Sequence, residues 1–483
     1  MKKAIRPLVT ALIIILFVAA DSFAGGSLIL KNARLIDGTG APIQNDVSIL
    51  IQDGRISKIG KDFPEQGIPE LDVQGSYVLP GLIDAHVHLM RGPGVAINNY
   101  DIPLNGKMWK NTWGKYISQY LRAYLACGVT TVLDAHAPTF LIKDIREHLA
   151  KGHPGPRFLT VGSFFSPPQG YSVSSYNPPV SSREDVERKL NEMQALGVIG
   201  IKASIEKGWN PVKDLPVHSK EILAAIKQGA AQRKLPVYVH ATAEEAFNTA
   251  LDMEVHALMH TLISRQKKQL SKTFIERMAH TKTYQVSTLS VMDAELIFHD
   301  LDRLKEPLLE ITVPQSELLT ARDPEAARTI RKMQMAAQLP WLLKPLAGMF
   351  ADSFYSKENM GLSLQNSQKA IYDLHQAGVK IVMGSDTVYI NYTVYSLHGF
   401  TSLREIELLG EAGLSPKEAI KAATVNAAEM IGLDQEIGTI EEGKRADLVI
   451  LKDNPLDNLS AFRTVRWTIK DGMAKTPEEW MTQ

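Results

Sequence analysis

The chain has 483 residues, of which 45% are hydrophobic and 22% are charged, as in a globular enzyme rather than a disordered or fibrous protein. Its length suggests one large domain and a smaller one. Lys plus Arg and Asp plus Glu are balanced at 53 each, so no global field favours nucleic acid, and a small molecule is the expected partner.

The N-terminus has the layout of a secretory signal peptide. Basic residues precede an apolar run from Leu8 to Ala20, and the small residues Ser22 and Ala24 follow it. We expect residues 1–24 to be removed and the protein to be secreted or periplasmic. The run is shorter than the roughly 20 residues that a spanning helix needs, so we expect no transmembrane span in the mature chain; a retained anchor is the alternative. The only cysteine, Cys127, excludes an intrachain disulfide.

Both ends of the chain are predicted to contribute to one small β-sandwich domain. Short alternating segments separated by turn residues fill residues 25–80, and similar segments recur in residues 433–483. The predicted strands are 27–36, 47–51, 56–59 and 73–79 in the first part, and 443–451 and 465–469 in the second. We therefore expect the two ends to bracket a central domain.

Strands and helices alternate through the central domain, residues 81–432. Eight strands are predicted, at 82–88, 129–134, 156–162, 198–203, 236–240, 255–260, 284–289 and 379–386. Helical periodicity between them indicates crossovers, so the α/β fold class expected is a (β/α)8 TIM barrel. A long helical insertion, about residues 291–366, separates the last two strands. It could be a lid, an oligomer face or a membrane-touching patch, although packing against the barrel is the commoner fate of such residues.

Reactive side chains occur where these strands end. His86 and His88 are two residues apart on the first strand and therefore face the same side. Two such imidazoles can chelate a metal such as zinc if other ligands converge on them. One further candidate is carried by the fourth strand, and the others end the fifth, sixth and eighth strands; the active site of a barrel lies at these carboxyl ends. They are Lys202, His240, His260 and Asp386.

Five sequence segments resemble the amidohydrolase superfamily of metal-dependent hydrolases, and more narrowly its prolidase-like and imidazolonepropionase-like branch. The resemblance covers nearly all of the chain after residue 24. The segments are Ile36–Gly40, Leu79–His88, Gly128–Thr131, Ala419–Ala428 and Gly438–Leu451.

The resemblance implies a site for two divalent metal ions, with zinc as the expected metal. His86, His88 and Asp386 would bind the more buried ion, and His240 and His260 the more exposed one. Lys202 would be carboxylated on its amine and bridge the pair, because a carbamate is an anionic oxygen ligand whereas a cationic lysine would be repelled. An unmodified Lys202 would instead indicate a single-metal site.

Other side chains remain candidates beside these ligands. His256 could face the same side as His260, deeper in the barrel, but His260 stands at the strand end. His136, Tyr171 and His398 lie in segments that follow strands and are candidate substrate contacts; surface or supporting roles are the alternative for the two histidines.

The function predicted is that of an exported binuclear amidohydrolase. A hydroxide between the two metals would attack an amide or other non-standard C–N bond, as in a dipeptide ending in proline or a cyclic amide. Asp386 would be the catalytic residue, accepting a proton and returning it to the leaving group. A lactone or phosphotriester hydrolase on the same site and a non-catalytic scaffold are the alternatives, and the oligomeric state, including a homo-oligomer, stays open.

Overall fold

The computed structural model describes residues 26–61, 63, 67–89, 114–174, 177–208, 214–387 and 395–482. The predicted signal peptide lies outside the described residues. Among the helices that are described, none is long and apolar enough to cross a membrane.

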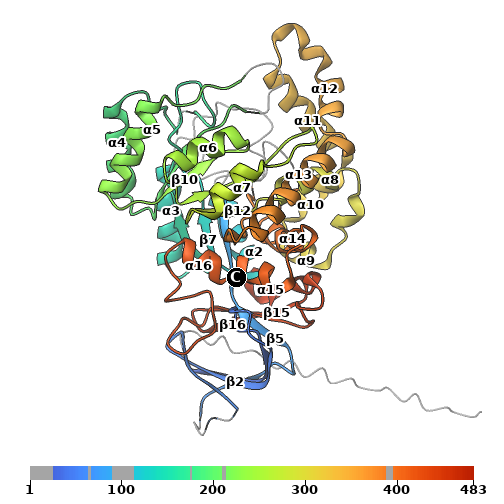
Figure 1. Cartoon of the computed structure of the whole chain (residues 1–483). Helices are drawn as coiled ribbons and strands as arrows, with labels where there is room; N and C mark the ends of the chain where they lie inside the picture. The colour runs from blue at the N-terminus through green and yellow to red at the C-terminus, as the bar shows by residue number, and fades with distance from the viewer. Residues whose placement is uncertain are drawn as a thin grey trace, which may run out of the picture.

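One mixed sheet of eight strands is built from both ends of the chain, at the lower end of the molecule in Figure 1. Its strands pair in the order β16-β15-β14-β5-β1-β2-β3, and β4 pairs with β1. The strands are β1 (Leu28–Leu35), β2 (Gln44–Gln52), β3 (Arg55–Gly60), β4 (Glu70–Asp72), β5 (Tyr77–Pro80), β14 (Leu448–Leu451), β15 (Val465–Lys470) and β16 (Met473–Lys475).

This mixed sheet differs from the two facing sheets of the predicted β-sandwich. It curls on itself, because the Ile56 N–H on β3 donates to the Lys444 carbonyl at 2.9 Å and Ile56 accepts from Gly443 at 2.8 Å, just before β14. Apolar residues from β1, β2, β3, β5, β14 and β15 form one core. A single curled sheet can enclose its own core, which removes the need for a second layer.

Two parallel sheets form the centre of the larger part of the molecule. The first has the order β6-β7-β8 and the second β13-β12-β11-β10-β9. Phe165, after β8, pairs with Ala203 on β9, and Val87 on β6 pairs with Thr387 after β13, so the sheets join at both edges. The strands are β6 (Leu82–Val87), β7 (Val129–Asp134), β8 (Arg157–Thr160), β9 (Ile201–Ser204), β10 (Val237–His240), β11 (Ala257–Leu258), β12 (Tyr284–Val286) and β13 (Ile381–Val382).

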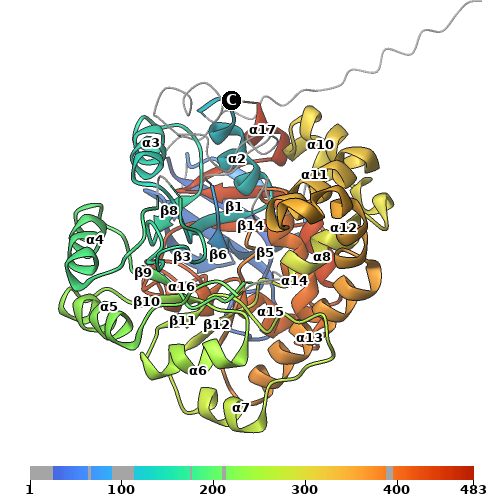
Figure 2. The same cartoon turned by 90° about the horizontal axis from the view of Figure 1, so that it is seen from above.

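Helices surround these strands, as the view from above shows (Figure 2). They are α2 (Gly114–Ala126), α3 (Thr139–Ala150), α4 (Arg183–Ala195), α5 (Lys220–Gln232), α6 (Glu244–Asp252), α7 (Lys272–Ala279), α14 (Phe400–Glu411), α15 (Pro416–Ala422) and α16 (Val425–Met430). The short η3 (Leu459–Arg463) and α17 (Pro477–Met481) follow β14 and β16. The alternation of strand and helix is the reason that the strands are parallel.

The segment between β12 and β13 is helical almost throughout. It contains α8 (Ser290–Ile297), η1 (Leu301–Leu304), α9 (Pro307–Thr312), α10 (Gln315–Arg322), α11 (Pro324–Gln338), η2 (Trp341–Leu346), α12 (Ala347–Phe354) and α13 (Lys357–Gln376). In Figure 1, α11 and α12 project from the end of the molecule opposite to the mixed sheet.

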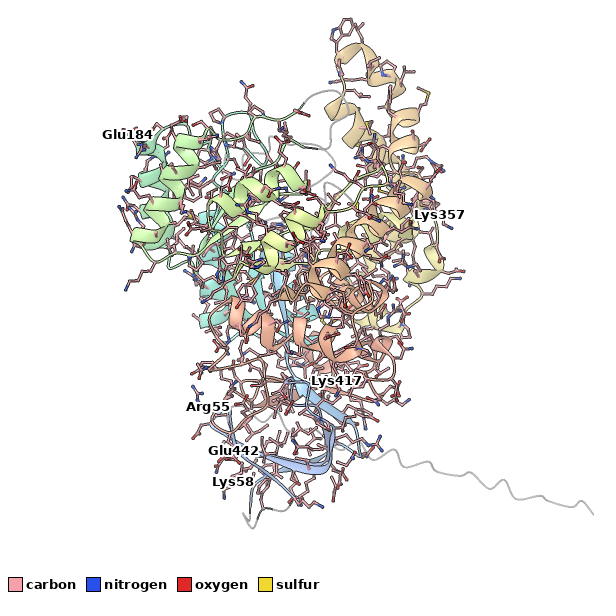
Figure 3. The ribbon with its side chains drawn as sticks, in the orientation of Figure 1. Arg55, Lys58, Glu184, Lys357, Lys417 and Glu442 are labelled. Carbon is pink, nitrogen blue, oxygen red and sulfur yellow. The ribbon has the colours of Figure 1, made fainter. Side chains whose placement is uncertain are left out.

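Polar contacts connect the mixed sheet to the rest of the chain. Lys417 on α15 donates to the Gly40 carbonyl at 3.1 Å, and Figure 3 places Lys417 above Arg55 and Glu442 of the sheet region. Arg55 itself bonds the Gly443 carbonyl at 2.8 Å and Glu436 at 2.9 Å.

Apolar side chains fill the space between the parallel strands. Ile83, Leu133, Val161 and Val286 are fully buried in one cluster, which also includes residues of α16. This apolar cluster occupies the space between the strands, and the candidate ligands lie toward the carboxyl ends.

Candidate metal centre

His86, His88 and Asp386 form a compact group of ligand atoms that lie within 4.8 Å of one another. The Asp386 Oδ1 atom is 3.0 Å from His88 Nε2 and 3.5 Å from His86 Nε2. Both imidazoles are buried, and the Asp386 side chain is 16% exposed. Two imidazoles and one carboxylate in this arrangement could hold a divalent cation.

Backbone geometry brings Asp386 to the two histidines. The Asp386 N–H donates to the His86 carbonyl at 2.7 Å, and Asp386 has a left-handed backbone with φ of +46°. A non-glycine residue in this region is uncommon and is often associated with a functional site. The turn after β13 therefore directs the carboxylate back toward β6.

His240 and His260 lie beside this group. The rings of His86 and His260 have centroids 4.7 Å apart, and those of His240 and His260 are 4.3 Å apart. His260 Nδ1 is 3.8 Å from Asp386 Oδ2 and 3.2 Å from the Thr288 hydroxyl. The Nε2 atoms of His240 and His260 are buried without a hydrogen-bond partner among the described residues.

Lys202 on β9 joins the same group from the adjacent side. Its Nζ is 3.0 Å from His86 Nε2 and lies over the Phe164 ring, 4.7 Å from the centroid. The side chain is fully buried, and burial lowers the pKa of Lys202 to about 7, although the charges of Asp386 and Asp134 oppose this shift. A substantial fraction of the amine is then neutral at neutral pH, and only the neutral form can react with carbon dioxide.

The donor set fits a metal centre. Burial lowers the pKa of His86, His240 and His260 well below the ordinary value, and the positive charge of Lys202 acts in the same direction. The three imidazoles are therefore neutral, which is the form that binds metals. Since a buried polar atom without a hydrogen bond is costly, the Nε2 atoms of His240 and His260 fit ligands of a second cation.

Two of the three candidate substrate contacts border this group. The Tyr171 ring stacks on His240 with centroids 4.1 Å apart and 17° between the planes. The buried His136 accepts the Phe164 N–H at Nδ1 over 3.3 Å, and its ring centroid is 6.3 Å from that of His88. Tyr171 and His136 therefore occupy the wall beside the two sets of histidines.

His398 and His256, the two remaining candidate histidines, contact α2 and α16. His398 Nδ1 is 3.0 Å from the Tyr124 hydroxyl, and its ring lies 4.4 Å from that of Tyr120, so it packs against α2. His256 Nε2 is 2.7 Å from the Met430 carbonyl on α16. The backbone contact of His256 places it away from the ligand group, so the alternative of His256 in place of His260 is wrong.

Sequence reasoning missed the acidic residues that position the ligands. Asp84 accepts the N–H groups of His86 and Ser385 at 3.2 and 3.0 Å, and the Ser402 hydroxyl at 2.6 Å. Burial raises the pKa of Asp84 to about 6 despite these hydrogen bonds. Asp84 lies two residues before His86 and so faces the same side of the strand, and this spacing could have identified it from the sequence.

Glu206 is a second missed acid. Its Oε2 accepts the Thr242 hydroxyl at 2.6 Å and lies 3.6 Å from His240 Nε2. Glu206 is buried, and burial raises its pKa. No motif marked this residue in the sequence, because its proximity to His240 arises from the neighbouring strands β9 and β10.

The model of the amidohydrolase family matches residues 77–475, which include all the ligand candidates. The chain belongs to the amidohydrolase family. The resemblance inferred from the sequence motifs is thereby confirmed, and the protein is a metal-dependent hydrolase of this family with a His-x-His and Asp metal site.

Curated amidohydrolase relatives match over different lengths. A dihydroorotase from Bacillus cytotoxicus is 41% identical over 66 residues, so the match spans only 14% of this chain and 15% of that relative. An imidazolonepropionase from Thermoplasma volcanium is 22% identical over 426 residues, 84% of each chain. The identity is thus higher over one short segment than over most of the chain.

A solved Xaa-Pro dipeptidase with bound methionine in its active site has a similar fold. The superposition has a TM-score of 0.69 and 21% sequence identity, and it covers 93% of this chain and 100% of the dipeptidase. The parallel sheets of the present chain therefore match those of TIM-barrel amidohydrolase structures. The chain has in addition the mixed sheet built from both of its ends.

Proposed function

We propose that this amidohydrolase is a binuclear enzyme that hydrolyses an amide or another non-standard C–N bond of a small molecule. The observation that carries the proposal is the convergence of six side chains from five strand ends into one buried group. These side chains are His86, His88, Lys202, His240, His260 and Asp386.

Two sets of donors would hold two divalent cations, with zinc as the expected metal. His86, His88 and Asp386 would bind one ion, His240 and His260 the other, and a carboxylated Lys202 would bridge them. Two such ions, when bound, lower the pKa of water and polarise a carbonyl group. The neutral imidazoles and the partly neutral Lys202 amine support this assignment.

Asp386 is the proposed catalytic residue. Its Oδ1 contacts His86 and His88, while Oδ2 is 3.8 Å from His260 Nδ1, so the carboxylate stands between the two sets of donors. It can accept a proton from the attacking water and then return it to the leaving nitrogen. One carboxylate would thereby serve as base and acid in turn.

The wall formed by Tyr171, Phe164 and His136 would contact the substrate. Phe164 lies between the other two, with ring centroids 4.5 Å from His136 and 6.0 Å from Tyr171. An apolar and aromatic wall suits a compact ring such as proline or a cyclic amide. The fold shared with a Xaa-Pro dipeptidase supports a dipeptide ending in proline. His398, which packs against α2, is not part of this wall.

Export and domain division are part of the same proposal. Residues 1–24 would be a signal peptide, and the enzyme would be secreted or periplasmic. Residues 25–80 and 433–483 would form the small β-domain. Residues 81–432 would form a closed (β/α)8 barrel, with the helical insertion at about 291–366.

Metal analysis and substrate profiling test this function together. We expect close to two equivalents of metal per chain and faster hydrolysis of dipeptides ending in proline or of cyclic amides than of lactones or phosphotriesters. Two equivalents of metal with faster hydrolysis of lactones or phosphotriesters would overturn the proposed C–N bond specificity but support the binuclear metal site. Metal content near zero after loading with zinc would overturn both and favour a non-catalytic scaffold.

A further inference from the structure

An apolar tip, residues 341–349, ends the hairpin formed by α11, η2 and α12. Of the large hydrophobic side chains that are exposed in the described part of the chain, five lie within these nine positions. Trp341 is 76% exposed, Leu342 67% and Met349 61%, and Leu343 and Leu346 are also exposed. Exposed apolar residues scattered singly are ordinary, but a cluster of this kind usually marks an interaction surface.

The tip is mounted on a hairpin that packs through its other face. Met335, Ala347 and Ala351 are buried, whereas η2 contains no buried residue. Arg331 on α11 forms a buried ion pair with Glu295 on α8 at 2.7 Å. The hairpin is therefore fixed to the body of the protein by its inner face, and the apolar tip remains outside that contact.

Basic residues are the only charged residues between Glu325 and the exposed Asp352. Residues 326–351 contain four basic residues and no Asp or Glu. Two of the four have carboxylate partners, since Arg331 pairs with Glu295 and Arg328 with Glu325. The other two, Lys332 and Lys344, are exposed, and the stem of Lys332 runs beside Gly348. Exposed cations therefore adjoin the apolar side chains.

The position of the hairpin defines which side of the molecule the apolar tip faces. The insertion leaves the barrel after β12, at the end of the strands where the candidate metal centre lies. Figure 1 shows α11 and α12 at the end of the molecule opposite to the mixed sheet, and Figure 3 shows their side chains spreading outward there. A surface that met the apolar tip would face the catalytic end of the barrel.

We propose that the apolar tip docks on the surface of an anionic lipid bilayer. Trp and Leu side chains next to Lys are suited to the boundary between headgroups and acyl chains, where the indole and the aliphatic groups are buried and the ammonium groups meet lipid phosphates. A second copy of the chain fits less well, because lysine is depleted in protein interfaces and the tip has no acidic residue to pair with Lys332 or Lys344. Docking does not depend on the hydrolytic activity.

Vesicle binding tests the proposal with the full chain, using phosphatidylglycerol-containing vesicles and pure phosphatidylcholine vesicles. We expect co-sedimentation with the anionic vesicles that weakens with salt, and quenching of Trp341 fluorescence by brominated lipids, lost in Trp341→Phe. The triple variant Trp341→Ser, Leu342→Ser, Met349→Ser should lower the bound fraction roughly tenfold or more. Lys332→Gln with Lys344→Gln should remove the preference for anionic vesicles.

Control substitutions of exposed residues outside the apolar tip distinguish docking by the tip from nonspecific adsorption to vesicles. Leu319→Ser, on α10, removes a side chain that is 58% exposed outside the apolar tip and should leave vesicle binding unchanged. Lys272→Gln removes an exposed lysine on α7 and should do the same. Equal vesicle binding by the wild-type chain and the triple variant, including no binding by either, would overturn the proposal. So would a triple variant that only converts an oligomer into monomers in size-exclusion chromatography.

Discussion

The Asp84 carboxylate accepts the backbone N–H of Ser385 at 3.0 Å and thereby joins the strand that carries His86 and His88 to the turn that carries Asp386. It also accepts the N–H of His86 and the hydroxyl of Ser402. The carboxylate thus links the two segments that carry the candidate ligands His86, His88 and Asp386.

Replacement of Asp84 by alanine should destabilise the protein and loosen the site. Three buried donors would lose their acceptor, which we expect to cost about 2 kcal/mol or more. Ser402→Ala removes one donor and leaves the two backbone bonds, so its effect should be smaller. Urea unfolding and metal analysis of both variants would measure this, and equal midpoints for Asp84→Ala and wild type would contradict the assignment.

Removal of Lys202 should reduce the number of metal ions that the site holds. If the proposed binuclear site is right, Lys202→Ala should lower metal content from near two equivalents toward one and reduce turnover by about 100-fold or more, since the proposed bridging ligand is lost. Acetate or propionate should restore part of the activity by supplying a carboxylate in the vacated space. Lys272→Ala, an exposed lysine, is the control, and unchanged metal content in Lys202→Ala would exclude a bridging role.

The Asp386→Asn substitution should abolish most turnover while metal content falls only partly. The amide keeps an oxygen that can bind metal but cannot accept the proton, and loss of such a group costs roughly 10²–10⁴-fold in rate. Asp352→Asn, in an exposed position on α12, should keep full activity. Steady-state kinetics with parallel metal analysis would measure both variants; unchanged kcat in Asp386→Asn would remove this residue from the mechanism.

Tyr171 offers a test that separates its ring from its hydroxyl. Tyr171→Phe keeps the ring against His240 and should leave metal affinity unchanged, with any effect confined to KM. Tyr171→Ala also removes the stacking partner of His240 and should weaken binding of the more exposed ion by about tenfold. Competition with a chelator would measure the metal affinities of the variants. Wild-type metal affinity in Tyr171→Ala would show that the Tyr171 ring does not support His240 as a ligand.

Glu317 should make stability depend on pH. Burial raises the pKa of Glu317 to about 8 from 4.5, against the hydrogen bond donated by the Tyr120 hydroxyl at 2.7 Å. Between pH 4.5 and about pH 8, Glu317 therefore stays protonated in the folded chain but is ionised in the unfolded chain. Its contribution to stability is complete below pH 4.5 and is lost as the pH rises to about 8.

Replacement of Glu317 by glutamine, which is neutral and of similar shape, tests this dependence of stability on pH. Glu317→Gln should raise the Tm relative to wild type at pH 8 to 9 and flatten its decline with pH. The exposed Glu358→Gln is the control and should follow wild type. Parallel Tm curves for Glu317→Gln and wild type across this range would show that the buried carboxyl is not responsible.

Part of the candidate site was predictable because its residues lie on or just after parallel strands. The alternation along a strand places His86 and His88 on one side, and the carboxyl ends of parallel strands lie at one end of the barrel. Lys202, His240 and Asp386 follow from the same rule. The role of Glu206 did not, since its proximity to His240 depends on the neighbouring strands β9 and β10, and the bond from Asp84 to Ser385 also joins segments far apart in the sequence.

The sequence by itself determined the order of strands and helices, the family and the set of candidate ligands, because periodicity and motifs are local properties of the chain. Only the tertiary structure decided that His398 turns to α2, that His256 bonds the Met430 carbonyl, and that the two chain ends form one curled sheet. These outcomes depend on how the strands close around a common core and on which neighbour each loop meets. Distances between residues far apart in the sequence arise only from that closure.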